Sequence, residues 1–212
     1  MNLLKMYCIS TQENDYKKIK SLGYLPVGLG QEKFNKEWLR DNFGKNIAKK
    51  NPYYGEYTFH YWLWKNYKLD FDGWIGFCQY RKFWKKNLNN YNDNNFNNFN
   101  SLLLKEIPND LNNYESIIGE NLFVNQFRFS KFIKHNLRNM LLNPSFFFYK
   151  NKRTIKFHFD MMHGFGNLDR AIKVLPIKDR SDFNDFVNSE VSFNPHNMFI
   201  CKNKKILYTY YE

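Results

Sequence analysis

The spacing of apolar and polar positions predicts short strands that alternate with helices. An apolar run at residues 4–11 ends in small hydroxyl residues, and a charged segment with a helical period follows at 12–21. A second apolar run at 23–30 contains Pro26, which favours a strand near the edge of a sheet. Strands that alternate with helices indicate an α/β fold.

The middle of the chain carries the clearest pattern. Large aromatic residues recur at helical spacing through 53–67, and the continuous apolar run at 74–80 suits a buried central strand. Arg81 and Lys82 follow this run directly. Open α/β sheets bind ligands at the carboxyl ends of their central strands, so these two cations predict a site for an anionic ligand.

The second half of the chain alternates less regularly. The Asn-rich stretch 87–100 predicts a flexible surface loop inside the domain. A strand pattern returns at 113–124, and a helical pattern follows at 126–150. The segment 157–176 predicts an amphipathic helix after a turn at its glycines, and 192–202 predicts a loop and a last strand.

Length and composition limit the class of protein. A chain of 212 residues predicts one domain over 1–212, with room for a small second lobe. The three cysteines lie far apart, and Cys8 and Cys78 stand inside apolar runs, which argues against a disulfide scaffold and a structural zinc site. Because the opening residues do not follow the pattern of a signal peptide and no apolar stretch reaches the ~18 residues of a membrane span, we expect a cytoplasmic protein.

The net charge of +12 calls for an anionic partner, unless it reflects only a lysine-rich surface. Nucleic acid, an anionic membrane and a pyrophosphate-bearing substrate all qualify. The segment 79–86 mixes aromatic residues with cations, a chemistry that suits nucleic-acid bases and a nucleoside diphosphate equally well. The structural alternative is that Phe83 and Trp84 belong to the core and that Arg81 pairs with Asp72.

Three long segments of the sequence are rich in aromatic residues, and together they form a distinctive pattern. They are KNPYYGEYTFHYWLWKNY at 50–67, WIGFCQYRKFW at 74–84 and FNPHNMFICK at 193–202. In this order they resemble a family of glycosyltransferases from bacterial capsule and exopolysaccharide gene clusters, long catalogued as a domain of unknown function. The resemblance extends over nearly the whole chain.

Individual positions can be matched to the motifs of that family. Glu56 matches the first residue of a Glu-Leu-Thr step, and Tyr80 and Arg81 match the exit from the central strand. Gln79 stands where the family commonly has His, and Lys82 stands where it has a second Arg. The departure at Gln79 puts in doubt any role that such a His would have as a base or a metal ligand.

The resemblance implies a GT-A-like, Rossmann-like fold that binds a nucleotide-sugar on a mostly parallel central sheet. It implies transfer of a sugar from a UDP-linked donor, with galactofuranose as a candidate, to an oligosaccharide or lipid-linked saccharide. On this interpretation we expect no nucleic-acid partner, and peripheral contact with the anionic inner face of the membrane is an option. We assign donor binding to Thr11, Gly28, Asn46, Glu56, Gln79, Tyr80, Arg81, Lys82 and Asn197.

Sugar transfer requires a base for the acceptor hydroxyl and positive charge for the departing nucleotide. Arg81 and Lys82 are the candidates for stabilising the leaving group. Asp160, His163 and Asp169 are the candidates for the base, because they cluster on a turn and at a helix start late in the chain. The alternative for each of the three is a helix cap or a surface charge.

Metal dependence is a separate question. Enzymes with the GT-A fold usually carry Asp-x-Asp after a central strand, where it holds a divalent metal, and this chain has 79–82 at that place. We therefore assign no metal ligand and no cofactor, and we expect activity without a metal. The alternative is Mn²⁺ or Mg²⁺ held by Asp70, Asp72 or Asp160.

Two other classes of function stay open, a nucleic-acid-binding module and a non-catalytic scaffold of a polysaccharide assembly. The scaffold is favoured by Gln79 and by the early end of the chain, since the family continues into a longer C-terminal helix. We therefore expect a shortened C-terminus. Glu56 is the only acid of the predicted aromatic helix, and we expect it to be buried and bonded to backbone or to a tyrosine hydroxyl.

Overall fold

The computed structural model describes residues 3–66, 69–86, 99–126, 141 and 144–212. Most of the predicted Asn-rich loop, 87–98, lies outside the described residues, as does most of the predicted helix at 126–150.

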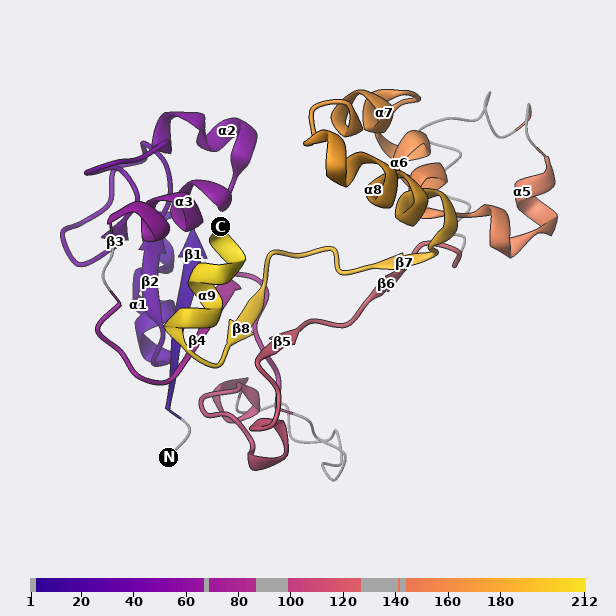
Figure 1. The fold of residues 1–212 in the computed structure, drawn as a ribbon. Helices are drawn as coiled ribbons and strands as arrows, with labels where there is room; N and C mark the ends of the chain where they lie inside the picture. The colour runs from indigo at the N-terminus through magenta and orange to yellow at the C-terminus, as the bar shows by residue number, and fades with distance from the viewer. Residues whose placement is uncertain (1–2, 67–68, 87–98, 127–140, 142–143) are drawn as a thin grey trace. The chain divides into compact units, whose positions relative to one another are not determined.

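The chain forms two compact units (Figure 1). Each unit has its own core of buried apolar side chains. Unit 1 comprises Met1–Gly119 and Asn197–Glu212, and unit 2 comprises Glu120–His196. That the two units act as one domain over 1–212 stays a prediction.

A six-stranded sheet forms the centre of unit 1, in the order β3-β2-β1-β4-β8-β5 (Figure 1). Its strands are β1 (Leu4–Ser10), β2 (Leu25–Gly28), β3 (Leu39–Arg40), β4 (Trp74–Gln79), β5 (Ser116–Ile118) and β8 (Phe199–Cys201). The strand β1 runs parallel to β2 and β4, and β2 runs parallel to β3, whereas β8 runs antiparallel to β4 and β5. The prediction of an α/β fold with a mostly parallel central sheet is confirmed.

Helices cover the two faces of this sheet. They are α1 (Tyr16–Ser21), α2 (Asn51–Tyr54), α3 (Tyr57–Asn66) and α9 (Lys204–Tyr211), with 3₁₀ turns η1 (Glu13–Asp15), η2 (Ala48–Lys50), η3 (Phe99–Leu102) and η4 (Asn109–Leu111). Met6 and Cys8 of β1 belong to the core that includes α1, and Tyr7 and Ile9 belong to the core that includes α3 and α9. Alternate residues of β1 thus face opposite sides, and both sides are apolar, as expected for a buried parallel strand.

The position of β2 agrees with the expectation from Pro26. That residue favours a strand near the edge of the sheet, and β2 lies second from the edge, between β1 and the edge strand β3. The strand β3 pairs only with Val27 and Gly28, so Pro26 lies outside that pairing and its missing N–H removes no hydrogen bond to β3. The short edge strand therefore accommodates a proline that a longer neighbour would exclude.

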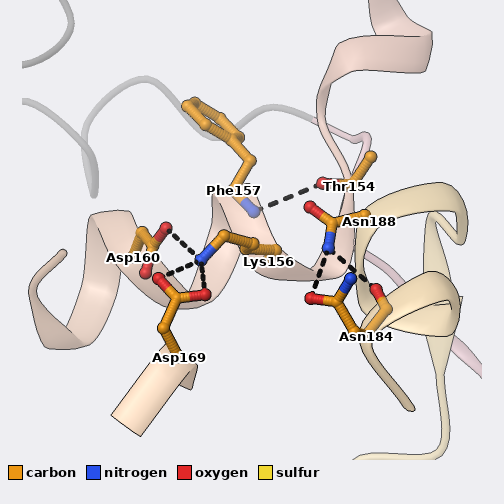
Figure 2. A network of polar contacts seen from close by, with 7 residues as sticks. All are labelled: Thr154, Lys156, Phe157, Asp160, Asp169, Asn184 and Asn188. Carbon is orange, nitrogen blue, oxygen red and sulfur yellow. Dashed lines mark hydrogen bonds and ion pairs between the residues drawn. The ribbon is translucent and has the colours of Figure 1, made fainter. Parts of the chain in front are cut away.

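Unit 2 is mainly helical. Its described elements are β6 (Leu122–Phe123), α5 (Ser145–Phe148), η5 (Lys150–Lys152), α6 (Ile155–His163), α7 (Asn167–Ile172), α8 (Ile177–Ser189) and β7 (Ser192–Phe193). Thr154 caps α6 by accepting a hydrogen bond from the backbone N–H of Phe157 (Figure 2). Gly164 and Gly166 have positive φ and form the predicted turn between α6 and α7. The strand pattern at 113–124 divides into β5 and β6, which belong to different units.

A buried histidine joins α3 to the C-terminal helix. The ring of His60 contacts Phe77 of β4, Phe199 of β8 and Tyr211 of α9. Its Nδ1 atom lies 2.8 Å from the Tyr211 hydroxyl oxygen, so the two groups share a hydrogen bond. Burial lowers the pKa of His60 to about 4, because charging the ring there would cost hydration.

This histidine makes stability depend on pH. Its pKa is about 4 in the folded chain and about 6.5 in the unfolded chain, so the unfolded chain takes up the proton first as the pH falls. We predict that His60 removes about 3 kcal/mol of unfolding free energy between pH 6.5 and pH 4. Urea titrations of the wild type and of His60→Gln across this range measure the effect. Equal losses of stability in the two proteins would contradict it.

Candidate functional site

The strand order of unit 1 reverses between β1 and β4. From β1 the chain continues to β2 on one side, and from β4 it continues to β5 on the other. Ligands of open α/β sheets bind where the order reverses, beyond the carboxyl ends of the strands. The candidate site is therefore the carboxyl edge, which we define as Ser10 and Thr11 at the end of β1 and the Gln79–Lys82 turn at the end of β4.

The Gln79–Lys82 turn is closed by its own backbone and anchored to β1. The N–H of Gln79 donates to the carbonyl of Lys82 at 3.1 Å, and the N–H of Lys82 donates back at 3.0 Å. The N–H of Tyr80 donates to the carbonyl of Ile9 at 3.0 Å. These bonds hold Tyr80 and Arg81 at the tip of the turn.

The tip of the turn presents charge to solvent. Arg81 is exposed, and its guanidinium carbon lies 4.8 Å from the centre of the Tyr80 ring. In the described part of the chain every ion pair involves Lys156, so Arg81 does not pair with Asp72. Phe83 and Trp84 do pack partly against the core. Of the structural alternative, the packing of Phe83 and Trp84 against the core is therefore present, whereas the ion pair between Arg81 and Asp72 is not.

Two side-chain hydrogen bonds tie the start of α3 to the carboxyl edge. The Nε2 of Gln79 donates to Oε2 of Glu56, and the hydroxyl of Tyr57 donates to Oδ1 of Asn197 at 2.8 Å. Glu56 and Tyr57 are neighbours in the chain, so the two bonds bring Gln79 and Asn197 to the start of the same helix. Three of the predicted donor-binding residues, Glu56, Gln79 and Asn197, therefore gather at one place.

The environment of Glu56 differs from the expectation. Its side chain is half-buried, and its partner is the amide of Gln79, not backbone or a tyrosine hydroxyl. The residue precedes α3, where the positive end of the helix dipole stabilises a negatively charged carboxylate. A position at the helix start leaves the side chain partly in solvent, whereas the apolar face of α3 enters the core.

A buried carboxylate holds the neighbouring loops to the same helix. Asp41 is fully buried and accepts hydrogen bonds from the Thr58 hydroxyl at 2.6 Å and from the Gly30 N–H at 3.1 Å. Burial raises the pKa of Asp41, and these two bonds oppose the rise. Arg40 donates to the carbonyls of Gly28 and Gly30. This network was not predicted from the sequence, where its one signal is an acid directly after β3.

The predicted donor-binding residues that remain are Thr11, Gly28 and Asn46. Thr11 is exposed directly after β1. A Cβ at Gly28 would lie 2.9 Å from the Phe34 ring, so packing alone explains the glycine. The side chain of Asn46 donates to the carbonyl of Gly44 and accepts from the N–H of Ala48, as in a turn. Their role in donor binding stays a prediction.

The three candidate bases lie in unit 2, whereas all of the predicted donor-binding residues lie in unit 1. The Nζ of Lys156 lies 3.4 Å from Oδ2 of Asp160 and 2.7 Å from both carboxylate oxygens of Asp169 (Figure 2). Lys156 thus joins α6 to α7. His163 is exposed at the end of α6, where its ring contacts Phe159. The proposed catalytic role of these three residues stays a prediction.

The carboxyl edge is poorly suited to a divalent metal. Mg²⁺ and Mn²⁺ prefer carboxylate oxygens, and the Gln79–Lys82 turn offers an amide and two cations instead. Among the described residues no group of three or more His, Cys, Asp or Glu side chains could hold a metal ion. Asp70, Asp72 and Asp160 are among the described residues, and none of them belongs to such a group. No helix in the described part of the chain is long and apolar enough to cross a membrane.

The chain belongs to the family described as a domain of unknown function (DUF4422), which matches residues 5–212. No curated protein matches it. Among solved structures the chain is similar to the apo structure of WbbM, described as a bifunctional glycosyltransferase, with 18% sequence identity and a TM-score of 0.47. The match covers 99% of this chain and 35% of the WbbM chain, so this chain spans about a third of that protein.

The Asp41 network predicts a measurable loss of stability. Thr58→Val keeps the shape of the side chain and removes the hydroxyl that donates to Asp41. We expect a loss of about 1–3 kcal/mol of unfolding free energy, because the buried carboxylate loses a partner. Urea denaturation measures it. Thr209→Val, at an exposed helix position, is the control and should change stability by less than about 0.5 kcal/mol. Similar changes in the two variants would contradict the prediction.

Proposed function

We propose that this chain is a GT-A-like glycosyltransferase that moves a sugar from a nucleotide-sugar to a saccharide acceptor. The observation that carries the proposal is the exposed cationic turn, which follows β4 at the point where the strand order reverses. The resemblance of the three aromatic segments to a glycosyltransferase family supports the same reading. The donor we propose is UDP-linked, with galactofuranose as a candidate sugar.

The chemistry of the turn fits a departing nucleoside diphosphate, which carries about two to three negative charges. Arg81 can bind phosphate oxygens through two parallel hydrogen bonds, and Lys82, Lys85 and Lys86 follow within the same segment. Fixed positive charge at the leaving group stabilises the transition state more than the bound donor. The ring of Tyr80, beside the guanidinium of Arg81, offers a surface for the nucleotide.

The proposed setting is the synthesis of capsule or another surface polysaccharide. The acceptor is then a growing oligosaccharide or a lipid-linked saccharide, and the enzyme works in the cytoplasm. The net charge of +12 would allow peripheral contact with the anionic inner face of the membrane. A base for the acceptor hydroxyl is still required, and the candidates Asp160, His163 and Asp169 remain proposals.

Arg81→Lys tests the role of the turn. Lysine keeps the charge but loses the two-pronged geometry, so we expect transition-state stabilisation to weaken by ~2 to 4 kcal/mol. Transfer and donor-hydrolysis assays with UDP-, GDP- and CDP-sugars measure this as a large drop in turnover. Arg170→Lys, at an exposed site on α7, is the matched control. Unchanged turnover in Arg81→Lys, with the control also active, would remove Arg81 from the site.

The same charges predict the response to chelation. If Arg81 and its neighbouring cations neutralise the departing diphosphate, a metal is not needed for that task. We expect the enzyme to keep most of its activity in excess EDTA, in an assay of sugar transfer with and without Mn²⁺. Complete inactivation by EDTA that a single divalent ion reverses would show instead that a metal holds the diphosphate.

A further inference from the structure

We propose that Glu56 is the general base that takes the proton from the acceptor hydroxyl. This inference rests on the proposed function. It replaces the sequence-based assignment of Glu56 to donor binding, and it sets a carboxylate of unit 1 against the candidate bases of unit 2. Three features of Glu56 support it. The carboxylate lies beside the Gln79–Lys82 turn, a hydrogen bond holds one of its oxygens, and the other oxygen has no partner in the described part of the chain.

Glu56 lies beside the leaving-group residues. Its partner Gln79 is the first residue of the Gln79–Lys82 turn, and Arg81 stands at the tip of that turn. A base and a leaving-group site must both flank the sugar carbon that reacts. In unit 1 this carboxylate is thus on the same edge of the sheet as the cations that would bind the diphosphate.

The carboxylate is oriented through one oxygen only. The amide of Gln79 donates to Oε2, which requires that oxygen to act as an acceptor. In the described part of the chain, Oε1 has neither a hydrogen bond nor an ion pair. A carboxylate with one fixed and one open oxygen can receive a proton at the open one without losing its orientation.

The other well-placed carboxylates are already engaged. Asp15 accepts from the Ser10 hydroxyl, and Asp41 is fully buried with two donors. Asp160 and Asp169 share the Lys156 ammonium. Glu56 is half-buried, and its side-chain partner in the described part of the chain is the neutral amide of Gln79, so its other oxygen stays accessible to a substrate hydroxyl.

The residues that flank Glu56 suit a saccharide. Tyr53 is 88% exposed, and Tyr57 is 49% exposed with its hydroxyl fixed on Asn197. Each tyrosine combines an apolar ring with a polar tip, and such rings can lie against the C–H face of a sugar while amides and hydroxyls bind its oxygens. The acceptor would therefore approach over these rings toward Oε1 of Glu56.

In the proposed step the acceptor O–H bond breaks and its proton moves to Oε1 of Glu56, while the acceptor oxygen forms the bond to the anomeric carbon. The bond from that carbon to the phosphate oxygen breaks, and its electron pair leaves on the nucleoside diphosphate. Arg81 and Lys82 offset the added negative charge.

Glu56→Gln removes the base and keeps the size of the side chain. We expect transfer turnover to fall about 10²- to 10⁴-fold, while the donor still raises the melting temperature as it does in the wild type. Azide is a nucleophile that carries no proton to remove, so added azide should restore donor cleavage in Glu56→Gln. Glu106→Gln is the matched control, because Glu106 pairs with Leu3 at the opposite edge of the sheet and is exposed.

Each outcome decides between the two proposals. If Glu56→Gln keeps the transfer rate of the wild type, or if it loses transfer and donor binding together, Glu56 is not the base. Either result leaves the proposal of a glycosyltransferase unaffected. Failure of azide to restore cleavage would overturn it as well. If Glu56→Gln does not fold, Glu56→Asp should still transfer sugar at a reduced rate, and its complete inactivity as a folded protein would contradict the proposal. A folded wild type that neither binds nor uses any nucleotide-sugar would refute the glycosyltransferase itself.

Discussion

The parallel pairing of β1 with β4 is the constraint on which the candidate site depends. The register sets Ile9 opposite Gln79, so both strands end at the same edge of the sheet. The hydrogen bond from the N–H of Tyr80 to the carbonyl of Ile9 then anchors the turn that carries Arg81 to β1. Because this is also where the strand order reverses, the charged tip of the turn stands where open α/β sheets bind their ligands.

The packing of α3 on this sheet supplies the second half of the site. Phe59 and Trp62 of α3 are buried against the face of the sheet that includes Phe77, and this contact fixes the start of the helix beside the end of β4. Glu56 thereby reaches Gln79. From sequence alone, Gln79 cast doubt on the site, because the resemblance implies a His at this position. In the structure the amide has a clear task, since it orients a carboxylate without adding a charge.

The parts of this fold that could be predicted are those in which local pattern and tertiary position agree. The apolar run at 74–80 is a buried strand in the centre of the sheet, and the cations after it lie at the carboxyl edge. Asp41 could not be found in this way, because its burial is imposed by Thr58 and the Gly30 loop and leaves no periodicity. The boundary between the two units at Gly119 could not be predicted either, because no change of composition marks it and the chain returns to unit 1 only at Asn197.

We propose that the carboxyl ends of β1 and β4 bind the diphosphate of a nucleotide-sugar. A crystal structure of the full chain with UDP would locate the diphosphate without reference to any sugar or acceptor. We expect the diphosphate to lie on the Gln79–Lys82 turn, within hydrogen-bond distance of Arg81 and with its uridine toward Thr11. A diphosphate bound only by residues of unit 2, with the turn free of it, would refute this proposal.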